Sequence, residues 1–177
     1  MSYAIYTIGH STRSGEDFIE ILKTHGIELL VDVRTIPKSR HNPQFNGDNL
    51  ERRLKANSIA YFHLSGLGGL RHAKKNSVNQ GWENASFRGF ADYMQTEEFE
   101  ESLLQLIDMA GKQKTVIMCA EAVPWRCHRS LIGDALLVRG ISVLDITSKS
   151  AVKQHTMTLW AEIQQLKVMY PKKQEGR

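Results

Sequence analysis

The amino-acid sequence predicts one α/β domain in which a mostly parallel β-sheet carries helices on both faces. Short apolar runs of strand length alternate along the chain with segments whose apolar residues recur at helical spacing. The chain of 177 residues is 41% hydrophobic, which is enough for one core, and it contains no internal repeat. Strands that alternate with helices are joined by crossovers, which favour a parallel sheet. We therefore expect a single domain over residues 1–177, with a frayed tail at residues 171–177.

The first three expected elements are a strand, a helix and a second strand. Residues 4–8 alternate in the manner of a strand, with aromatic and β-branched side chains. Ser14 and Asp17 resemble a capping box, and the apolar residues that follow have helical spacing until Gly26 ends the helix. Residues 28–33 are a second apolar run of strand length.

The middle of the chain is less regular. Prolines exclude a helix from residues 37–47, and Leu50 and Leu54 then stand one turn apart on a short helix. A third strand is expected at residues 61–64 and a polar, basic surface loop at residues 71–86. The remaining elements expected here are helices at residues 87–95 and 97–110.

A strand, a loop and a helix make up the central unit of the last part of the chain. Residues 115–118 are a continuous apolar run, and residues 129–139 carry apolar side chains at helical spacing up to Gly140. A last strand is expected at residues 142–146. Residues 157–169 again have apolar side chains at helical spacing, so we expect a C-terminal helix that packs on the sheet.

Chemically versatile side chains gather where the predicted strands end. The carboxyl ends of parallel strands share one edge, which is where open α/β sheets bind their ligands. Both cysteines of the chain lie in the turn that follows residues 115–118. The candidate catalytic residues are Cys119, Glu121, Asp32 and His10. The candidate substrate-binding residues are Ser11, Arg34, Arg40, Arg126, Cys127, His128 and Arg129.

Three kinds of chemistry suit this set. A thiolate at Cys119, close to loop amides and a helix start, would have a lowered pKa and could attack a sulfur, phosphorus or carbon electrophile. On this basis we expect faster alkylation of Cys119 than of Cys127. The arginines and the free amides could instead hold a phosphate without covalent chemistry. Third, a transition metal could bind, although the chain has no Cys-x-x-Cys motif; its ligands would be Cys119, Glu121, Cys127 and His128.

Each candidate also has a purely structural interpretation. Free cysteine is among the most buried residue types, so Cys119 and Cys127 could simply fill the core. Asp32 and Arg34 point the same way from a strand and could form a structural ion pair. His10 could bond a backbone carbonyl. The joint occurrence of these residues at one edge of the sheet favours a site.

Charge and composition limit the partners and the location. Residues 32–90 contain ten Lys or Arg against four Asp or Glu, whereas residues 91–111 contain six acidic residues and no basic one. The basic stretch favours an anionic small molecule or nucleic acid as the partner. The sequence has no apolar run of about 18 residues and no signal segment, so we expect a cytoplasmic protein without membrane contact. We expect no cofactor, and the sequence leaves the oligomeric state open.

Several short motifs occur together in this chain. They are Tyr6-Thr7-Ile8-Gly9-His10-Ser11, Asp32-Val33-Arg34 with Pro37-Lys38-Ser39-Arg40, Leu67-Gly68-Gly69, Phe87-Arg88-Gly89-Phe90 with Tyr93-Met94, Cys119-Ala120-Glu121, and Cys127-His128-Arg129. In these motifs the sequence resembles domain of unknown function family 488, a bacterial and archaeal family with no settled activity. The Asp-Val-Arg strand end and the later cysteine, loop, arginine and helix are also similar to rhodanese-like domains. These resemblances imply a rhodanese-like or flavodoxin-like sheet.

Taken together, these features predict an enzyme that acts on an anionic substrate, phosphate-bearing or linked to nucleic acid. The reaction would take place in a cleft of cysteine, arginine and histidine side chains at the carboxyl ends of the strands. Two alternatives stay open at this point: a non-catalytic module that binds nucleic acid, and a metal-dependent enzyme with cysteine, glutamate and histidine ligands.

Overall fold

The computed structural model of the protein describes residues 3–173, and its main sheet has six strands in the order β3-β2-β4-β1-β5-β6. Strands β1 to β5 run parallel, and β6 pairs antiparallel with β5 at one edge. The strands are β1 (Ala4–Gly9), β2 (Leu29–Asp32), β3 (Ala60–His63), β4 (Thr115–Cys119), β5 (Ser142–Ile146) and β6 (Val152–Gln154). The prediction of a mostly parallel sheet is confirmed.

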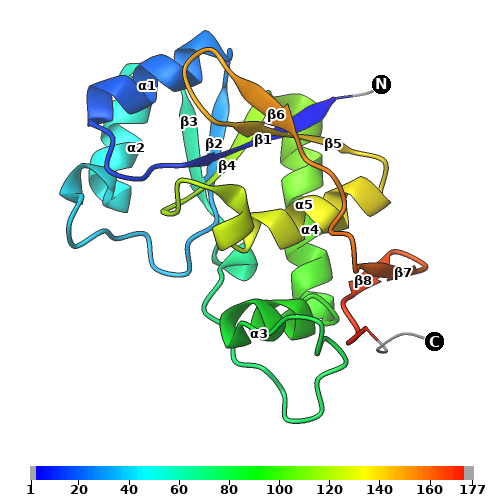
Figure 1. Cartoon of the computed structure of the whole chain (residues 1–177). Helices are drawn as coiled ribbons and strands as arrows, with labels where there is room; N and C mark the ends of the chain where they lie inside the picture. The colour runs from blue at the N-terminus through cyan, green and yellow to red at the C-terminus, as the bar shows by residue number, and fades with distance from the viewer. Residues whose placement is uncertain (1–2, 174–177) are drawn as a thin grey trace.

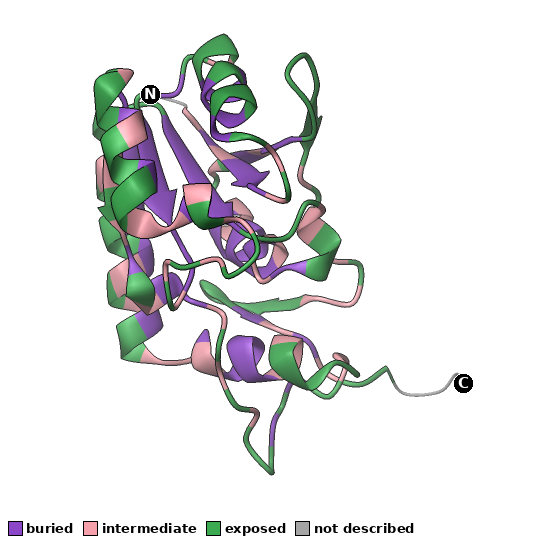
Figure 2. Cartoon of the chain, turned by 90° about the vertical axis from the view of Figure 1, so that its left-hand side faces the viewer, coloured by how far each residue is buried: buried purple, intermediate pink, exposed green. Residues whose placement is uncertain are grey.

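Helices cover both faces of this sheet, as predicted. Figure 1 shows α1 and α2 together on one side and α4 and α5 on the other. The helices are α1 (Gly15–Thr24), α2 (Gly47–Ala56), α3 (Ala85–Tyr93), α4 (Glu97–Lys112) and α5 (Arg129–Val138). One hydrophobic core lies between the sheet and α1 and α2, and a second lies between the sheet and α3, α4 and α5. Figure 2 shows buried strands between helices whose outer surfaces are exposed.

Strand β4 distributes its side chains between the two cores. Val116 and Met118 belong to the core under α1 and α2, whereas Ile117 and Cys119 belong to the core under α4 and α5. Successive strand residues point to opposite faces, and both faces here are covered, so all of β4 is buried and the four residues after Thr115 are apolar. As a result, the thiol of Cys119 faces the side of the sheet on which α5 lies.

The order of the strands produces a crevice beside β4. Its neighbours β1 and β2 lead into α1 and α2 on one face, whereas β4 leads into α5 on the other. Connections that leave neighbouring strands in opposite directions open a gap at the carboxyl ends, and ligands of open α/β sheets bind there. The residues that follow β2 and β4 are therefore well placed for a site.

The predicted C-terminal helix at residues 157–169 is wrong. The segment instead forms a turn and an antiparallel hairpin of β7 (Glu162–Gln164) and β8 (Lys167–Met169). The apolar residues whose spacing indicated a helix are exposed, and Leu159 is 93% exposed. Burial follows an alternating pattern through Val168 and Tyr170, and the Tyr170 hydroxyl donates a 2.7 Å hydrogen bond to Asp134 of α5. This contact holds the end of the hairpin against α5.

Other boundaries differ less. The strand at residues 142–146 is not the last one, because β6 follows it with exposed side chains that gave no apolar pattern. The linker at residues 37–47 contains a short 3-10 turn, Pro43–Phe45, and α3 begins inside the expected loop. Of the predicted frayed tail, residues 174–177 lie outside the described part of the chain. Within the described part, none of the helices combines the length and the apolar character needed to cross a bilayer.

Candidate active site at the ends of strands β2 and β4

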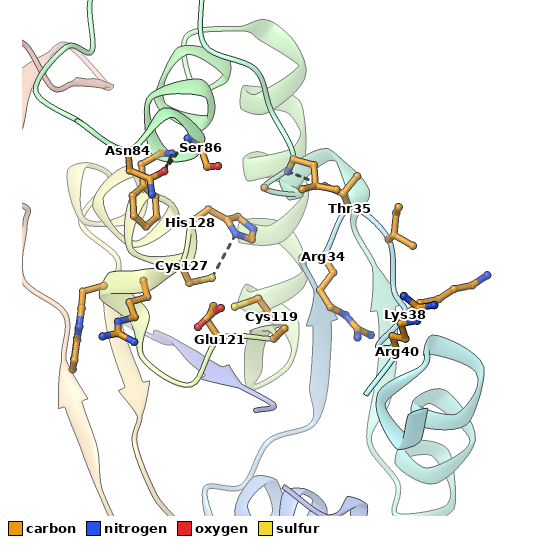
Figure 3. A pocket seen from close by; sticks show the side chains of 17 residues that line it. Arg34, Thr35, Lys38, Arg40, Asn84, Ser86, Cys119, Glu121, Cys127 and His128 are labelled. Atoms are coloured by element: carbon orange, nitrogen blue, oxygen red, sulfur yellow. Dashed lines mark hydrogen bonds between the residues drawn. The ribbon is translucent and has the colours of Figure 1, made fainter. Parts of the chain in front are cut away.

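A cleft with a volume of about 990 Å³ opens at the carboxyl ends of β2 and β4 (Figure 3). Among the residues that line it are seven sequence-predicted ones: Arg34, Arg40, Cys119, Glu121, Arg126, Cys127 and His128. The cleft is also lined by Lys38, which follows β2, and by Asn84, Ser86 and Trp125. The other four predicted residues, His10, Ser11, Asp32 and Arg129, lie outside the lining. The predicted gathering of side chains at this edge is therefore found for most of the set.

Cys127 lies between a short 3-10 turn (Pro124–Arg126) and the start of α5. Its side chain is buried but reaches the wall of the cleft. The sulfur accepts a hydrogen bond from the backbone N–H of Arg129 at 3.5 Å, and it lies 3.5 Å from Nδ1 of His128. An N–H group at the start of a helix favours a negative charge, so this position suits a thiolate.

The hydrogen bonds of His128 determine which of its nitrogens carries a proton. Its Nε2 lies 2.9 Å from the backbone carbonyl of Val33, which can only accept a hydrogen bond. Nε2 must therefore be the donor, and Nδ1 of the neutral ring is left with a free lone pair that faces Cys127. Phe90 packs edge-on against the same ring at a centroid distance of 5.0 Å. His128 is thus oriented as an acceptor for the thiol proton.

The pKa values of the two cysteines are shifted in opposite directions. Burial raises the pKa of Cys119 well above its usual value, and the hydrogen bond and the charge of Cys127 raise it further. Burial alone would also raise the pKa of Cys127. Its hydrogen bonds with Cys119 and His128, the charge that His128 carries once it has taken the thiol proton, and the charge of Arg129 lower that pKa well below its usual value instead. These directions are opposite to our expectation that Cys119 is the more reactive thiol.

Arg129 lies beneath the cleft, buried against β1. Its guanidinium donates to the backbone carbonyl of Glu121 at 2.7 Å and to Oγ1 of Thr7 at 3.3 Å. Burial would lower the pKa of Arg129, but the sulfur atoms of Cys119 and Cys127 raise it. Arg129 therefore fixes the loop that carries Glu121. Its positive charge also lowers the pKa of both thiols. The carboxylate of Glu121 itself is exposed in the cleft.

Asp32 is buried and holds Arg34. Its two oxygens accept hydrogen bonds from Nε and Nη2 of Arg34 at 2.9 and 2.7 Å, and the hydroxyl of Tyr61 adds a third at 2.7 Å. Burial and the Asp32 charge raise the pKa of Tyr61, so this hydroxyl stays a donor. With both oxygens occupied, the carboxylate of Asp32 is placed to orient Arg34.

His10 and Ser11 continue β1 next to the end of β4. The backbone N–H groups of His10 and Ser11 donate to the carbonyls of Cys119 and Ala120 at 2.8 and 2.9 Å. The His10 ring is buried and stacks on Phe45 at 4.4 Å, and its Nδ1 lies 2.8 Å from the Ser11 carbonyl. Burial lowers the pKa of His10, so the ring is neutral. Both residues support the cleft from behind its wall.

Sequence reasoning missed the wall that comes from the start of α3. Asn84 caps this helix by accepting the N–H of Ser86 at 2.8 Å, and both residues line the cleft. An asparagine before a helical pattern predicts the cap, but the sequence does not indicate that this helix end lines the same cleft as the end of β4. Across residues 3–173, no three His, Cys, Asp or Glu side chains are arranged to hold a metal ion.

A comparison with protein-family models finds a match. The model of the domain of unknown function DUF488 matches residues 14–136, which is more than half of the chain. The chain belongs to the DUF488 family. The matched segment of this DUF488 protein includes both cysteines, Arg34 and His128, whereas His10 and Ser11 precede it. No curated protein and no solved structure is significantly similar to the chain.

Proposed function

We propose that this DUF488 protein is an enzyme in which Cys127 is the nucleophile and an anionic substrate occupies the cleft. The pairing of Cys127 with His128 carries the proposal. Cysteine nucleophiles are activated by a lowered pKa and a neighbouring base, and Cys127 has both. In this proposal Cys119 stays protonated and donates its hydrogen bond to Cys127.

The reaction can be followed through its proton transfers. His128 Nδ1 takes the proton of the Cys127 thiol and leaves a thiolate. The thiolate attacks an electrophilic carbon, phosphorus or sulfur atom of the substrate, and the bond to the leaving group breaks as the bond to Sγ forms. His128 then gives its proton to the leaving group. Water attacks the covalent intermediate, His128 accepts one of its protons, and Cys127 returns as a thiolate.

The charges of the cleft favour a negatively charged substrate. Four cationic side chains line it against one carboxylate, that of Glu121; the four are Arg34, Lys38, Arg40 and Arg126. Guanidinium and ammonium groups bind phosphate, sulfate and carboxylate oxygens strongly. A substrate anion would therefore be drawn to the same cleft that holds the thiolate.

The experiment compares two alkylating agents that differ in charge. Iodoacetate is an anion and iodoacetamide is neutral, and both label a thiolate. We expect both to label Cys127 faster than Cys119 at pH 7, with rates read for each cysteine by peptide mass spectrometry. The ratio of the iodoacetate rate to the iodoacetamide rate at Cys127 should exceed the ratio for 2-mercaptoethanol by about tenfold, because cationic clefts concentrate anions.

Variants separate the two parts of the proposal. His128→Gln should slow both agents at Cys127 by about tenfold or more, because the base is removed. His72→Gln, a change at an exposed histidine outside the cleft lining, should leave both rates unchanged. Lys38→Gln and Arg40→Gln should lower the iodoacetate rate alone. If Cys127 is inert toward both agents in the folded protein, the proposed nucleophile is wrong.

A further inference from the structure

Arg34 carries a buried hydrogen-bond donor that has no acceptor. The residue is only 7% exposed, and its Nη1 contacts no acceptor among residues 3–173. The other donors of the guanidinium are in use, since Nε and Nη2 bond Asp32 and Nη2 also bonds the carbonyl of Phe45 at 2.8 Å. A buried charged donor without a partner is costly, so an acceptor that reaches Nη1 would bind favourably.

The guanidinium is held rigidly at the wall of the cleft. Asp32 and the Phe45 carbonyl fix it from behind. The segment that follows β2 is also fixed, because the N–H of Ser39 donates to Oδ1 of Asn46 and the N–H of Gly47 donates to the carbonyl of Pro37, both at 2.8 Å. A ligand group that binds here therefore meets an arginine whose orientation is already set.

Two further cations follow Arg34 in the chain. Lys38 and Arg40 belong to the same segment, line the same cleft and have exposed side chains. In Figure 3 the guanidinium of Arg34 lies between Cys119 on one side and Lys38 and Arg40 on the other. These three cations and the carboxylate of Asp32 leave a local net charge of +2. That charge matches the two negative charges of a phosphate monoester, whereas a phosphodiester carries only one.

We infer that Arg34, Lys38 and Arg40 form a subsite for the phosphate of a phosphate monoester. The inference rests on the proposed function, whose anionic substrate it specifies. Arginine presents several N–H donors in a plane that suits phosphate oxygens, and Nη1 is the nitrogen of Arg34 that has no partner among residues 3–173.

The subsite holds the substrate and does not place its phosphorus at the nucleophile. In Figure 3 Cys127 lies on the side of Cys119 that faces away from Arg34. A phosphate on Arg34 is thus held beyond Cys119, and a different atom of the same substrate meets Cys127. The phosphate serves as the group by which the enzyme recognises and positions its substrate.

Binding is measured by calorimetry on the Cys127→Ser variant, with inorganic phosphate and dimethyl phosphate at pH 8 as probes. Inorganic phosphate, which is mostly a dianion at this pH, should bind at least about tenfold more tightly than the monoanionic diester. Arg34→Lys keeps the charge but loses the fixed Nη1 and should weaken phosphate binding by about tenfold. Lys38→Gln and Arg40→Gln should each weaken it by roughly threefold, and Lys55→Gln on α2, an exposed lysine outside the cleft lining, should not.

Two sources of a monoester phosphate are distinguished with adenosine monophosphate and a single-stranded oligonucleotide with or without a 5′ phosphate. A phosphorylated strand that binds no tighter than adenosine monophosphate assigns the subsite to small molecules. Tighter binding of that strand assigns it to nucleic-acid ends. Equal binding of the phosphorylated and unphosphorylated strands, together with no measurable binding of adenosine monophosphate, would overturn the monoester subsite.

Equal affinity for inorganic phosphate and dimethyl phosphate would also overturn it, as would unchanged phosphate binding by a folded Arg34→Lys. If Arg34→Lys does not fold, the double variant Lys38→Gln/Arg40→Gln decides, because its changes are exposed. Retained phosphate affinity in that variant contradicts the inference. These measurements use a protein without the Cys127 thiol, so failure of the subsite and failure of the nucleophile are observed separately.

Discussion

Gly69 touches the imidazole ring of His128 so closely that a larger residue does not fit. A Cβ atom on Gly69 would lie 2.7 Å from Nδ1 and 3.0 Å from Cγ of His128. Nδ1 is the nitrogen that faces the Cys127 sulfur. The ring cannot retreat freely, because Phe90 packs against it and Val33 holds its Nε2. Gly69 therefore keeps open the space in which Cys127 and His128 meet.

Gly69→Ala should displace the His128 ring and slow the alkylation of Cys127 at pH 7 by about tenfold, as expected when a base is misplaced. Gly111→Ala is the matched control, since a Cβ at Gly111 would meet only Tyr3 at 3.9 Å or more. Both rates are measured by labelling with iodoacetamide, quenching the reaction at successive times and quantifying the labelled peptide by mass spectrometry. Full Cys127 reactivity in Gly69→Ala would show that His128 does not activate the thiol.

His10 should make the fold sensitive to acid. Burial lowers its pKa below the usual value of 6.5, so the unfolded chain takes up this proton first as the pH falls. Stability is then lost as the pH drops below about 6.5, because the unfolded state binds more protons. The His10→Phe variant keeps the stacking on Phe45 and should lose less melting temperature between pH 7 and pH 5 than the wild type. If the melting temperatures of the two proteins fall by the same amount between pH 7 and pH 5, His10 is not the acid-sensitive group. The charges of Arg34 and Arg13 lower the pKa of His10 further, and the charge of Asp32 raises it.

Two substitutions test the C-terminal hairpin against a helix. Val168 is 2% exposed in the second core, whereas Leu159 is 93% exposed. Val168→Ala should cost roughly 1 to 3 kcal/mol of unfolding free energy, measured by urea titration. Leu159→Ala should change it by no more than about 0.5 kcal/mol. A loss of several kcal/mol at Leu159 would favour a helix packed on the sheet after all.

Asp92 anchors the loop at residues 71–84. This buried carboxylate accepts hydrogen bonds from the N–H of Lys74, the hydroxyl of Ser77 and the amide of Asn79. In Asp92→Asn the side-chain NH₂ group would face the donors that now bond the carboxylate. The substitution should lower the free energy of unfolding by about 1 to 3 kcal/mol. Trypsin should then cleave faster after Lys74, as followed by gel electrophoresis. The control Asp108→Asn removes only an exposed ion pair and should leave the cleavage rate unchanged.

The sequence predicted an element correctly where the spacing of its apolar residues matches the face that the fold buries. Phe18 and Leu22 lie on one side of α1, and Ser14 accepts the N–H of Asp17 at 3.1 Å, as the capping pattern predicts. The uninterrupted apolar run of β4 also predicted its complete burial. Such elements follow from local patterns alone, because each needs only a covered face.

Local patterns could not supply the contacts that distinguish the two thiols. The pKa of Cys127 depends on Cys119, His128 and Arg129, and the orientation of His128 depends on the carbonyl of Val33 at the end of a different strand. The helical spacing around Leu159 led to a wrong prediction for the same reason, since Asp134 of α5 bonds both Thr158 and Tyr170, the residues on either side of the hairpin. These contacts join residues far apart in sequence.

The position of β1 between β4 and β5 has a consequence for how the chain reaches its fold. Residues 10–114 separate β1 from β4, so the ends of this long segment must meet before the central pair of strands can form. Pairings between distant parts of a chain form slowly, because closing the intervening loop costs entropy. As the chain emerges from the ribosome, β2 and β3 can pair early, whereas β1 stays unpaired until β4 has been made. Cys119 and Cys127 are made late for the same reason, so the reactive thiol belongs to the part of the chain that completes folding.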